Sequence, residues 1–331
     1  MKLPIRKRYL LLILALVLAL IAAMGPKPTY PVIDAQISPL DIPLTEIDAY
    51  IQKKEATFPL KEDNQARIVW ADSIPQKTPY SIVFVHGFSA SPMVGNPIVQ
   101  EVADRYGCNV YFSRLAEHGI DDIESFKTIS PKDLVESVKE AIAVGNVIGE
   151  KTIIMASSTG ATLSIYLAAL NPEKVDALLC YAPLIALADP SGKLLSYPWG
   201  LQIARKVFGR NYHKIKTDRP GVPKYWTMQY RLEGLMAVQY LLDEAMTPAI
   251  FEQIKQPLLV TYYHKDEDNQ DHIISVEAAK EFYNTVATPE EQKALMELTN
   301  AGGHVLLSDI QAKDLKEARQ VTFDFLDGIV E

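Results

Sequence analysis

The chain has 331 residues, a hydrophobic content of 48% and a formal net charge of -8 at pH 7. A chain of this length and composition can bury a sizeable core, which excludes a wholly disordered protein. The acidic balance argues against nucleic-acid binding, because such a surface needs clustered positive charge. The two cysteines, Cys108 and Cys180, belong to no Cys/His cluster, so we expect no zinc site. Their spacing neither requires nor forbids a disulfide between them.

The N-terminus has the pattern of an export signal. An unbroken apolar stretch runs from Tyr9 to Met24, and it is preceded by the basic residues Lys2, Arg6, Lys7 and Arg8. We interpret residues 1–24 as either a cleaved secretory signal or an uncleaved signal-anchor, since the stretch is short for a membrane span and lacks a clean cleavage site. In both cases the rest of the chain is expected outside the cytoplasm, in the periplasm or the extracellular space.

Residues 25–65 are expected to form a linker followed by a short helix. Several prolines interrupt the first part, which disfavours regular structure (Pro26, Pro28, Pro31 and Pro39). Residues 43–55 place apolar side chains on one helical face (Leu44, Ile47, Tyr50 and Ile51).

From residue 66 to residue 331, short apolar runs alternate with helical patterns. The runs cover residues 66–71, 81–86, 109–115, 152–157, 177–182, 257–263 and 294–298. Most are continuous rather than alternating, as in strands that are buried on both faces of a parallel sheet. Helical patterns cover residues 94–106, 131–148, 160–170, 275–287 and 312–328. This order predicts an α/β domain with a mostly parallel, doubly wound sheet.

Residues 185–250 interrupt this alternation. They contain no good strand pattern, but several helix-like pieces are rich in Tyr, Trp and Met. A loop of this length seldom lacks structure of its own. We therefore expect a helical insertion that covers the sheet as a cap; peripheral helices without a lid role are the alternative.

The fragment MASSTG, residues 155–160, joins an apolar run to a helical pattern. A nucleophilic serine on a strand-to-helix turn needs small residues two positions before and after it. With Ser158 at the centre these positions hold Ala156 and Gly160, whereas Ser157 would be flanked by methionine and threonine. The fragment favours Ser158 as nucleophile, although alanine replaces the first glycine of the G-x-S-x-G pattern. A serine that caps a helix is the alternative.

A second fragment, VHGFSASP at residues 85–92, follows an earlier apolar run. An oxyanion hole needs two backbone N–H groups directed at one point. We expect one from Thr159, directly after the nucleophile, and one from Phe88 on this loop, where Gly87 allows a close turn. By itself, His-Gly after a strand is consistent with an ordinary tight turn. The fragment around Ser158 is what favours an oxyanion-hole loop instead.

The chain has six histidines, and their order relative to Ser158 separates them. In hydrolases of this kind the nucleophile is followed by an acid and then by the histidine. His304 lies in AGGHV, after the last apolar run and before the final helix. The others precede Ser158, lie in the insertion or belong to the acid region (His86, His118, His213, His264 and His272). We expect His304 to be the base; a solvated loop histidine is the alternative.

The orienting acid is expected on the loop KDEDNQDHIIS, residues 265–275. Asp271 is followed by one residue and then by two apolar residues that re-enter the fold, which suits an orienting acid. Asp268 is followed by Asn269 and Gln270 and ranks second. A solvated acidic loop or a cation site is the alternative interpretation.

These fragments occur in order and together resemble the α/β-hydrolase superfamily. The resemblance is closest to its carboxylesterase and monoacylglycerol-lipase-like branch, which is similar to the serine aminopeptidase S33 group. It rests on the HGF fragment, the run SRLAEHG at residues 113–119, Ser158, Asp271 and His304. It spans residues 66–330 and departs from the branch at Glu117, where glycine is common. It implies an α/β-hydrolase fold with a helical cap.

The expected activity is hydrolysis of carboxylic esters with small or medium acyl groups, lipids among them. Ser158 attacks the carbonyl, His304 takes its proton and Asp271 orients the imidazole. No cofactor is expected. The partners are a small-molecule ester or lipid and, through residues 1–24, a membrane. A peptidase or thioesterase on the same fold, or a membrane-tethered binding protein without activity, are the alternatives.

Overall fold

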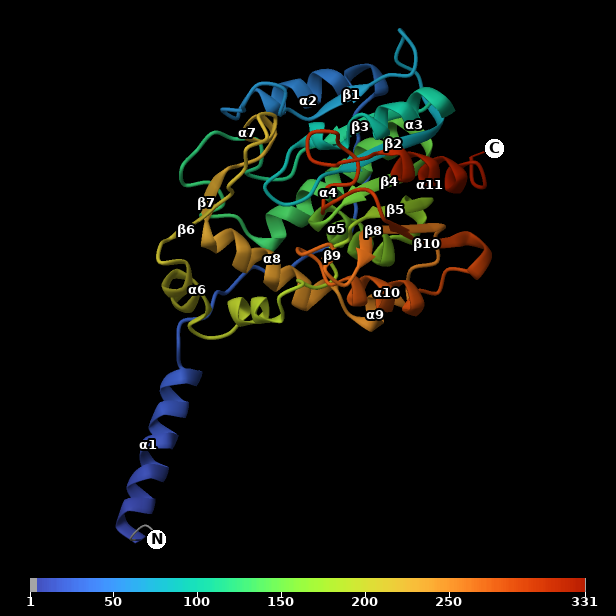
Figure 1. Cartoon of the computed structure of the whole chain (residues 1–331). Coiled ribbons are helices and arrows are strands. Elements are labelled where there is room, and N and C mark those ends of the chain that lie inside the picture. The colour runs from blue at the N-terminus through green and yellow to red at the C-terminus, as the bar shows by residue number, and fades with distance from the viewer. Residues whose placement is uncertain (1–4, 331) are drawn as a thin grey trace.

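The computed structural model describes residues 5–330 and is built around one sheet (Figure 1). The strand order is β1-β3-β2-β4-β5-β8-β10, and the short β9 (Asn269–Gln270) pairs with β8. From β3 to β10 all neighbours are parallel, whereas β1 and β9 are antiparallel to theirs. The seven main strands are β1 (Arg67–Val69), β2 (Thr78–Val85), β3 (Asn109–Ser113), β4 (Gly149–Ser157), β5 (Ala177–Tyr181), β8 (Leu258–Asp266) and β10 (Lys293–Leu298). The predicted doubly wound sheet is confirmed.

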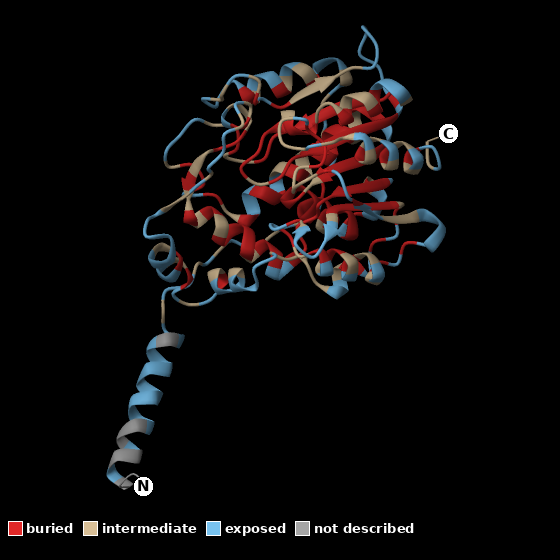
Figure 2. Ribbon diagram, in the orientation of Figure 1, coloured by how far each residue is buried: buried red, intermediate tan, exposed pale blue. Residues whose placement is uncertain are grey.

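Helices cover both faces of the sheet. On one face α4 (Pro131–Ile148) and α5 (Thr159–Leu170) pack against the central strands. On the other, α3 (Ile98–Tyr106) and α11 (Lys316–Leu326) are joined by an ion pair between Glu101 and Arg319. The central strands from β3 to β8 are consequently buried over most of their length, whereas the edge strands β1 and β10 are only partly buried (Figure 2).

The remaining helices of this domain follow its later strands and loops. α10 (Val276–Thr285) packs against β8, and the short helices are η2 (Pro92–Gly95), η3 (Pro172–Lys174) and η5 (Glu290–Gln292). The start of α4 follows from its sequence: Ser130 and Asp133 form a reciprocal capping box, and proline opens the first turn.

The N-terminal segment begins with α1 (Ile5–Ala23), which projects from the body (Figure 1). Among the described residues, no helix combines the length and apolar character that crossing a bilayer requires. The following segment is extended, as expected of a linker, but it lies on the body: Ile37 is 2% exposed and its N–H donates to Oδ1 of Asn171. It leads into η1 (Leu44–Glu46) and α2 (Ile47–Glu55).

The insertion, residues 185–250, connects β5 to β8. It contains η4 (Pro190–Ser196), α6 (Gly200–Phe208), β6 (Tyr212–Lys214), α7 (Val222–Tyr225), β7 (Gln229–Arg231), α8 (Leu232–Ala245) and α9 (Pro248–Phe251). The expectation that it holds no strand is wrong, because β6 and β7 form a two-stranded antiparallel sheet. Each has three residues, which is too short to produce a recognisable alternation of apolar and polar side chains.

Candidate active site

Ser158 occupies the sharp turn between β4 and α5. Its φ of 52° and ψ of -120° lie in a region that non-glycine residues rarely adopt, so the turn stores backbone strain. The N–H of Ser158 donates to the carbonyl oxygen of Tyr181 at 3.0 Å, which ties the turn to β5. Strain that the surrounding structure maintains in this way is typical of functional positions.

The small residues around Ser158 are explained by close backbone contacts. A Cβ atom on Gly160 would lie 2.3 Å from the carbonyl oxygen of Val85 and 2.5 Å from that of His86. Ala156 is fully buried in β4. The turn therefore brings α5 against the end of β2 at a distance that only glycine allows.

The loop after β2 reaches Ser158 through Gly87. A Cβ atom on Gly87 would lie 3.0 Å from Cβ of Ser158. Among the described residues, the backbone N–H of the next residue, Phe88, has no hydrogen-bond acceptor. Thr159 opens α5, so its N–H has no acceptor within its own helix. Both N–H groups expected to form an oxyanion hole are thus available to an acceptor.

The side chain of Phe88 anchors this loop in an aromatic cluster. Its ring centroid lies 5.2 Å from that of His118, 4.6 Å from Phe126 and 5.4 Å from Tyr230. Tyr230 belongs to β7, and the N–H of Thr227 just before it donates to the carbonyl oxygen of Ser89 at 2.7 Å. The insertion therefore helps to hold the loop that carries Phe88.

His304 and Asp271 meet across two loops. Nδ1 of His304 lies 2.7 Å from Oδ2 of Asp271, so the Nδ1–H donates to the carboxylate and Nε2 is the basic nitrogen. Oδ1 of Asp271 accepts from the N–H groups of Ile273 at 2.8 Å and Ile274 at 3.2 Å. The carboxylate is fixed from both sides.

The environment of Asp271 favours its charged form. Burial by itself raises the pKa of this carboxyl, which is 3% exposed. The imidazole of His304 and the two backbone N–H groups outweigh burial, so the pKa of Asp271 lies below its ordinary value. Asp271 is therefore an anion at neutral pH.

Asp268, the second candidate acid, is exposed on the same loop and its N–H donates to Oδ1 of Asp266. The structure brings Asp271, and not Asp268, to His304. Among the other histidines, His264 lies 3.3 Å from Glu297 and His213 stacks on Tyr230. Both cysteines are free and buried.

Two buried histidines support the site in a way that the sequence did not indicate. Nε2 of His86 accepts from the N–H of Leu115 at 3.1 Å, and its Nδ1–H donates to the carbonyl oxygen of Gly87 at 2.8 Å. Burial lowers the pKa of His86 to about 4. His118 is also buried, and burial lowers its pKa well below the ordinary value. The neutral His86 ring joins the loops after β2 and β3.

A hollow of about 190 Å³ adjoins His304. The insertion forms one wall through residues 215–222, and the loop of His304 forms the other. Nη1 of Arg219 connects the walls, because it donates to the carbonyl oxygens of Ile310 and Gln311. A small molecule in this hollow would contact both the insertion and the histidine.

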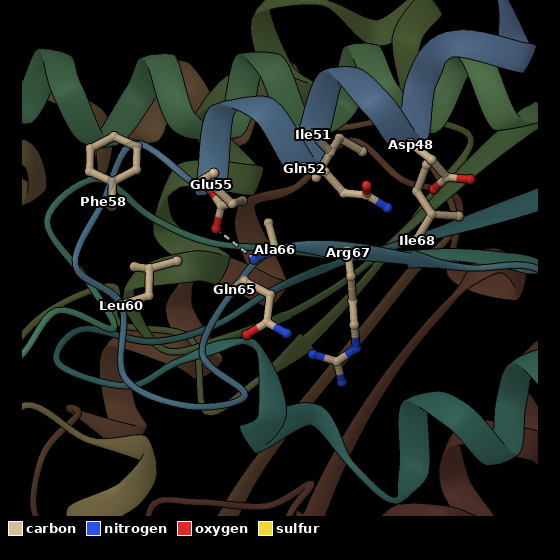
Figure 3. Close-up of a pocket in the computed structure, with 11 residues that line it drawn as sticks. Asp48, Ile51, Gln52, Glu55, Phe58, Leu60, Gln65, Ala66, Arg67 and Ile68 are labelled. Carbon is tan, nitrogen blue, oxygen red and sulfur yellow. Dashed lines mark hydrogen bonds between the residues drawn. The ribbon is translucent and has the colours of Figure 1, made fainter.

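A second hollow, of about 410 Å³, lies between α2 and β1 and contains none of the expected site residues (Figure 3). Its walls include Glu55, whose carboxylate accepts from the N–H of Ala66, and the side chain of Arg67. Within residues 5–330, no group of three or more His, Cys, Asp or Glu side chains is arranged to hold a metal ion.

A serine on a strained strand-to-helix turn of a mostly parallel sheet, with a following histidine, defines the α/β-hydrolase class. The model of the family described as serine aminopeptidase, S33, matches residues 76–311. This chain belongs to that hydrolase family. A search of curated proteins found no match.

Solved structures of lipases and esterases share the fold. One structure, from work on the metagenome-derived lipolytic enzymes LipS and LipT, gives a TM-score of 0.65 at 15% identity, covering 81% of this chain and 99% of the other. The monoacylglycerol lipase of Paleococcus ferrophilus gives 0.59 at 15% identity, covering 80% and 98%. A soluble variant of monoglyceride lipase from Saccharomyces cerevisiae gives 0.56 at 11% identity, covering 80% and 91%. At these identities the likeness concerns the fold.

Proposed function

We propose that this hydrolase cleaves carboxylic esters with small or medium acyl groups, lipids among them, through Ser158, His304 and Asp271. The observation that carries the proposal is the 2.7 Å hydrogen bond between Nδ1 of His304 and the buried Asp271, which leaves Nε2 as the basic nitrogen. The similarity in fold to enzymes described as lipases and a monoacylglycerol lipase supports an ester as the substrate class.

In the proposed mechanism, Nε2 of His304 takes the proton from Oγ of Ser158 as the oxygen attacks the ester carbonyl carbon. The N–H groups of Phe88 and Thr159 donate to the oxyanion that forms. His304 then gives the proton to the departing alcohol, which leaves an acyl-enzyme. Water, activated by the same imidazole, attacks the acyl carbon and releases the acid and the free serine.

Replacement of the nucleophile tests this proposal. Ser158→Ala removes the attacking oxygen, so we expect hydrolysis of a short-chain aryl ester to fall by about five to six orders of magnitude. Ser157→Ala, one residue earlier in β4, is the matched control and should retain activity and labelling by a fluorophosphonate probe. A folded Ser158→Ala variant that keeps its activity would falsify the assignment. A wild-type chain that neither reacts with the probe nor hydrolyses esters would instead fit a binding protein.

Peptide hydrolysis is the second candidate function, and the description of the matched family as a serine aminopeptidase favours it. The same proposed residues would act on an amide carbonyl, with the amine as the leaving group that His304 protonates. A series of aryl esters of rising acyl length and a series of aminoacyl anilides, compared by kcat/KM, separates the two functions. Thioesters in the same assay test a thioesterase.

We further propose that residues 1–24 direct the chain to the outside of the cytoplasmic membrane. The basic residues before the apolar stretch support this orientation, because basic flanks stay on the cytoplasmic side. Fractionation of cells that express the full chain tests it: recovery of full-length protein in the soluble cytoplasm would contradict the proposal. The size of the exported protein distinguishes a cleaved signal from a retained anchor.

A further inference from the structure

Large apolar side chains are exposed on one side of the insertion, around η4 and α6. We call this set the α6 face, and its members are Leu194, Tyr197, Trp199, Ile203, Val207 and Phe208. Val207 is 76% exposed and Tyr197 is 59% exposed. The opposite side of α6, with Gly200 and Ala204, is buried against the insertion. Contiguous exposed apolar side chains of this kind mark an interaction surface.

The same segment is strongly basic in an acidic chain. Residues 190–217 contain six basic side chains and no Asp or Glu, although the whole chain carries a net charge of -8. The six are Lys193, Arg205, Lys206, Arg210, Lys214 and Lys216. Arg205 is paired with Glu233, and the other five have no ion-pair partner among residues 5–330. A surface that combines apolar and basic side chains complements an anionic lipid surface.

The α6 face also holds the end of α1. The indole N–H of Trp199 donates to the carbonyl oxygen of Ile21, and its backbone N–H donates to that of Pro26, both at 3.0 Å. Gly25 lies so close that a Cβ atom there would overlap the Trp199 ring. Apolar side chains of α1 such as Leu12 and Leu16 are exposed, and the helix leaves the body beside α6 (Figures 1 and 2).

We propose that the α6 face docks on an anionic lipid bilayer, next to the exposed apolar side chains of α1; this rests on the location at the cytoplasmic membrane proposed above. Tyr197 and Trp199 then lie at the level of the headgroups, where amphipathic aromatic rings are favoured. Ile203 and Val207 enter the apolar boundary, and the basic side chains contact lipid phosphates. Contact with α1 favours the bilayer over a protein partner, because two apolar surfaces of the chain meet at Trp199. The proposal is independent of the reaction at Ser158.

A fluorescent probe on the α6 face tests the docking in the full-length chain. Val207→Cys can be labelled selectively with an environment-sensitive nitrobenzoxadiazole group, because Cys108 and Cys180 are 2% and 0% exposed. Ile74→Cys is the matched control, because Ile74 is 74% exposed in the loop between β1 and β2. That loop lies at the opposite end of the body from α1 (Figure 1). Both proteins are reconstituted into phosphatidylglycerol-containing vesicles with doxyl-labelled lipid.

We expect the emission at position 207 to shift to shorter wavelength and to be quenched by the doxyl lipid, and the emission at position 74 to change in neither respect. A vesicle-bound protein whose position 207 is not quenched overturns the proposal, since α1 alone would then attach the chain. A shift at position 207 without quenching also overturns it and indicates a second copy or another protein on this face. Equal quenching at positions 207 and 74 also overturns it, because the chain would then have no preferred orientation on the bilayer.

The charge requirement is tested separately. Lys206→Glu with Arg210→Glu should reduce the quenching at position 207 in anionic vesicles, as should replacement of the anionic lipid by phosphatidylcholine. Lys53→Glu with Lys77→Glu, on α2 and the β1–β2 loop, makes the same change of charge far from the face and should leave the quenching unchanged. Quenching that persists in neutral vesicles and after reversal at 206 and 210 overturns the proposed contact with anionic lipid.

Discussion

Asp271 is the residue whose replacement gives the sharpest test at the residue scale. The buried carboxylate accepts from Nδ1 of His304 and from two backbone N–H groups. Asp271→Asn keeps the size of the side chain but reverses the hydrogen bond, so the imidazole adopts the wrong tautomer. We expect kcat for an aryl ester to fall by about four orders of magnitude, with far-ultraviolet circular dichroism unchanged.

Asp268→Asn is the control for that substitution. Asp268 is exposed on the same loop, and its backbone N–H donates to Asp266, whereas the imidazole of His304 is held by Asp271. We expect kcat within a factor of about two of the wild type, as for an exposed substitution away from the site, where effects are generally small. Comparable losses in the Asp271→Asn and Asp268→Asn variants, measured in the same ester assay, would show that Asp271 has no special role.

The sequence indicates the candidate acid more clearly than it indicates the buried residues that support the site. The pattern of an acid, one further residue and two apolar residues indicates Asp271. In the structure the N–H groups of Ile273 and Ile274 both donate to its carboxylate, but only Ile274 returns to the core, because Ile273 is 51% exposed. The position of His86 could not be interpreted in that way. Its acceptor nitrogen meets the N–H of Leu115, which is 29 residues away, and no local pattern reports such a contact.

At the element scale, Gly160 determines how closely α5 approaches β2. In Gly160→Ala the new Cβ would meet two backbone carbonyl oxygens, which are unable to move like a flexible side chain. We expect unfolding in urea to show a loss of about 1–3 kcal/mol, as for other overpacked positions. Ester hydrolysis should fall further than stability, because the displaced turn carries Ser158.

Gly328→Ala is the control for that substitution, because the nearest atom to its Cβ would be at an ordinary contact distance of 3.5 Å. Its free energy of unfolding should remain within about 0.5 kcal/mol of the wild type. If Gly160→Ala behaved in the same way, the close approach of α5 to β2 would not be rigid.

The buried ion pair between Glu55 and Arg114 holds α2 against the sheet. Nε and Nη2 of Arg114 lie 2.7 and 2.8 Å from the two carboxylate oxygens, and the side chains of Arg114 and Glu55 are 3% and 7% exposed. Glu55→Leu leaves a buried guanidinium without its counter-ion, so we expect a loss of about 3–5 kcal/mol in urea unfolding. Glu55→Leu combined with Arg114→Met should recover much of that loss. A single variant as stable as the wild type would contradict this account.

How far elements could be predicted depended on their length. Six main strands of five to nine residues and the helix at residues 131–148 produce long apolar or capped patterns, and the structure has them in the expected places. β1 has only three residues but lies within the longer predicted run at residues 66–71. β6 and β7 have three residues each, and their pairing at His213 and Tyr230 involves partners 17 positions apart. The sequence also does not predict that residues 25–43 pack on the body, because a single buried side chain such as Ile37 produces no periodic pattern.

At the scale of the whole molecule, side-chain contacts join the insertion to the loops at the carboxyl ends of the strands. Phe88 joins the loop after β2 to β7, and Arg219 joins the insertion to the loop after His304. His86 connects two of the loops beneath this contact. The stability of this end of the molecule should therefore respond to the charge of one buried ring.

His86 makes the stability of the fold sensitive to mild acid. Its pKa is lowered to about 4 in the folded chain by burial, whereas an unfolded histidine has a pKa of about 6.5. Between these values the unfolded chain binds a proton that the folded chain excludes, so the free energy of unfolding falls as the pH falls. The full effect is about 3 kcal/mol, reached near pH 4. The depressed pKa of Asp271 acts only at lower pH, because its loss of stability begins as the pH approaches the unfolded value of about 3.9.

Urea unfolding of wild type and His86→Gln at pH 7, 6 and 5 tests this account. Glutamine can donate and accept at the same loops but does not titrate, so the variant should be less stable at pH 7 and lose less stability between pH 7 and 5. His118, also buried and neutral, keeps part of the slope in both proteins. A pH dependence equal to that of the wild type would show that His86 is not the proton acceptor. The difference in slope is expected to approach about 1.4 kcal/mol per pH unit below pH 6, the value for one proton.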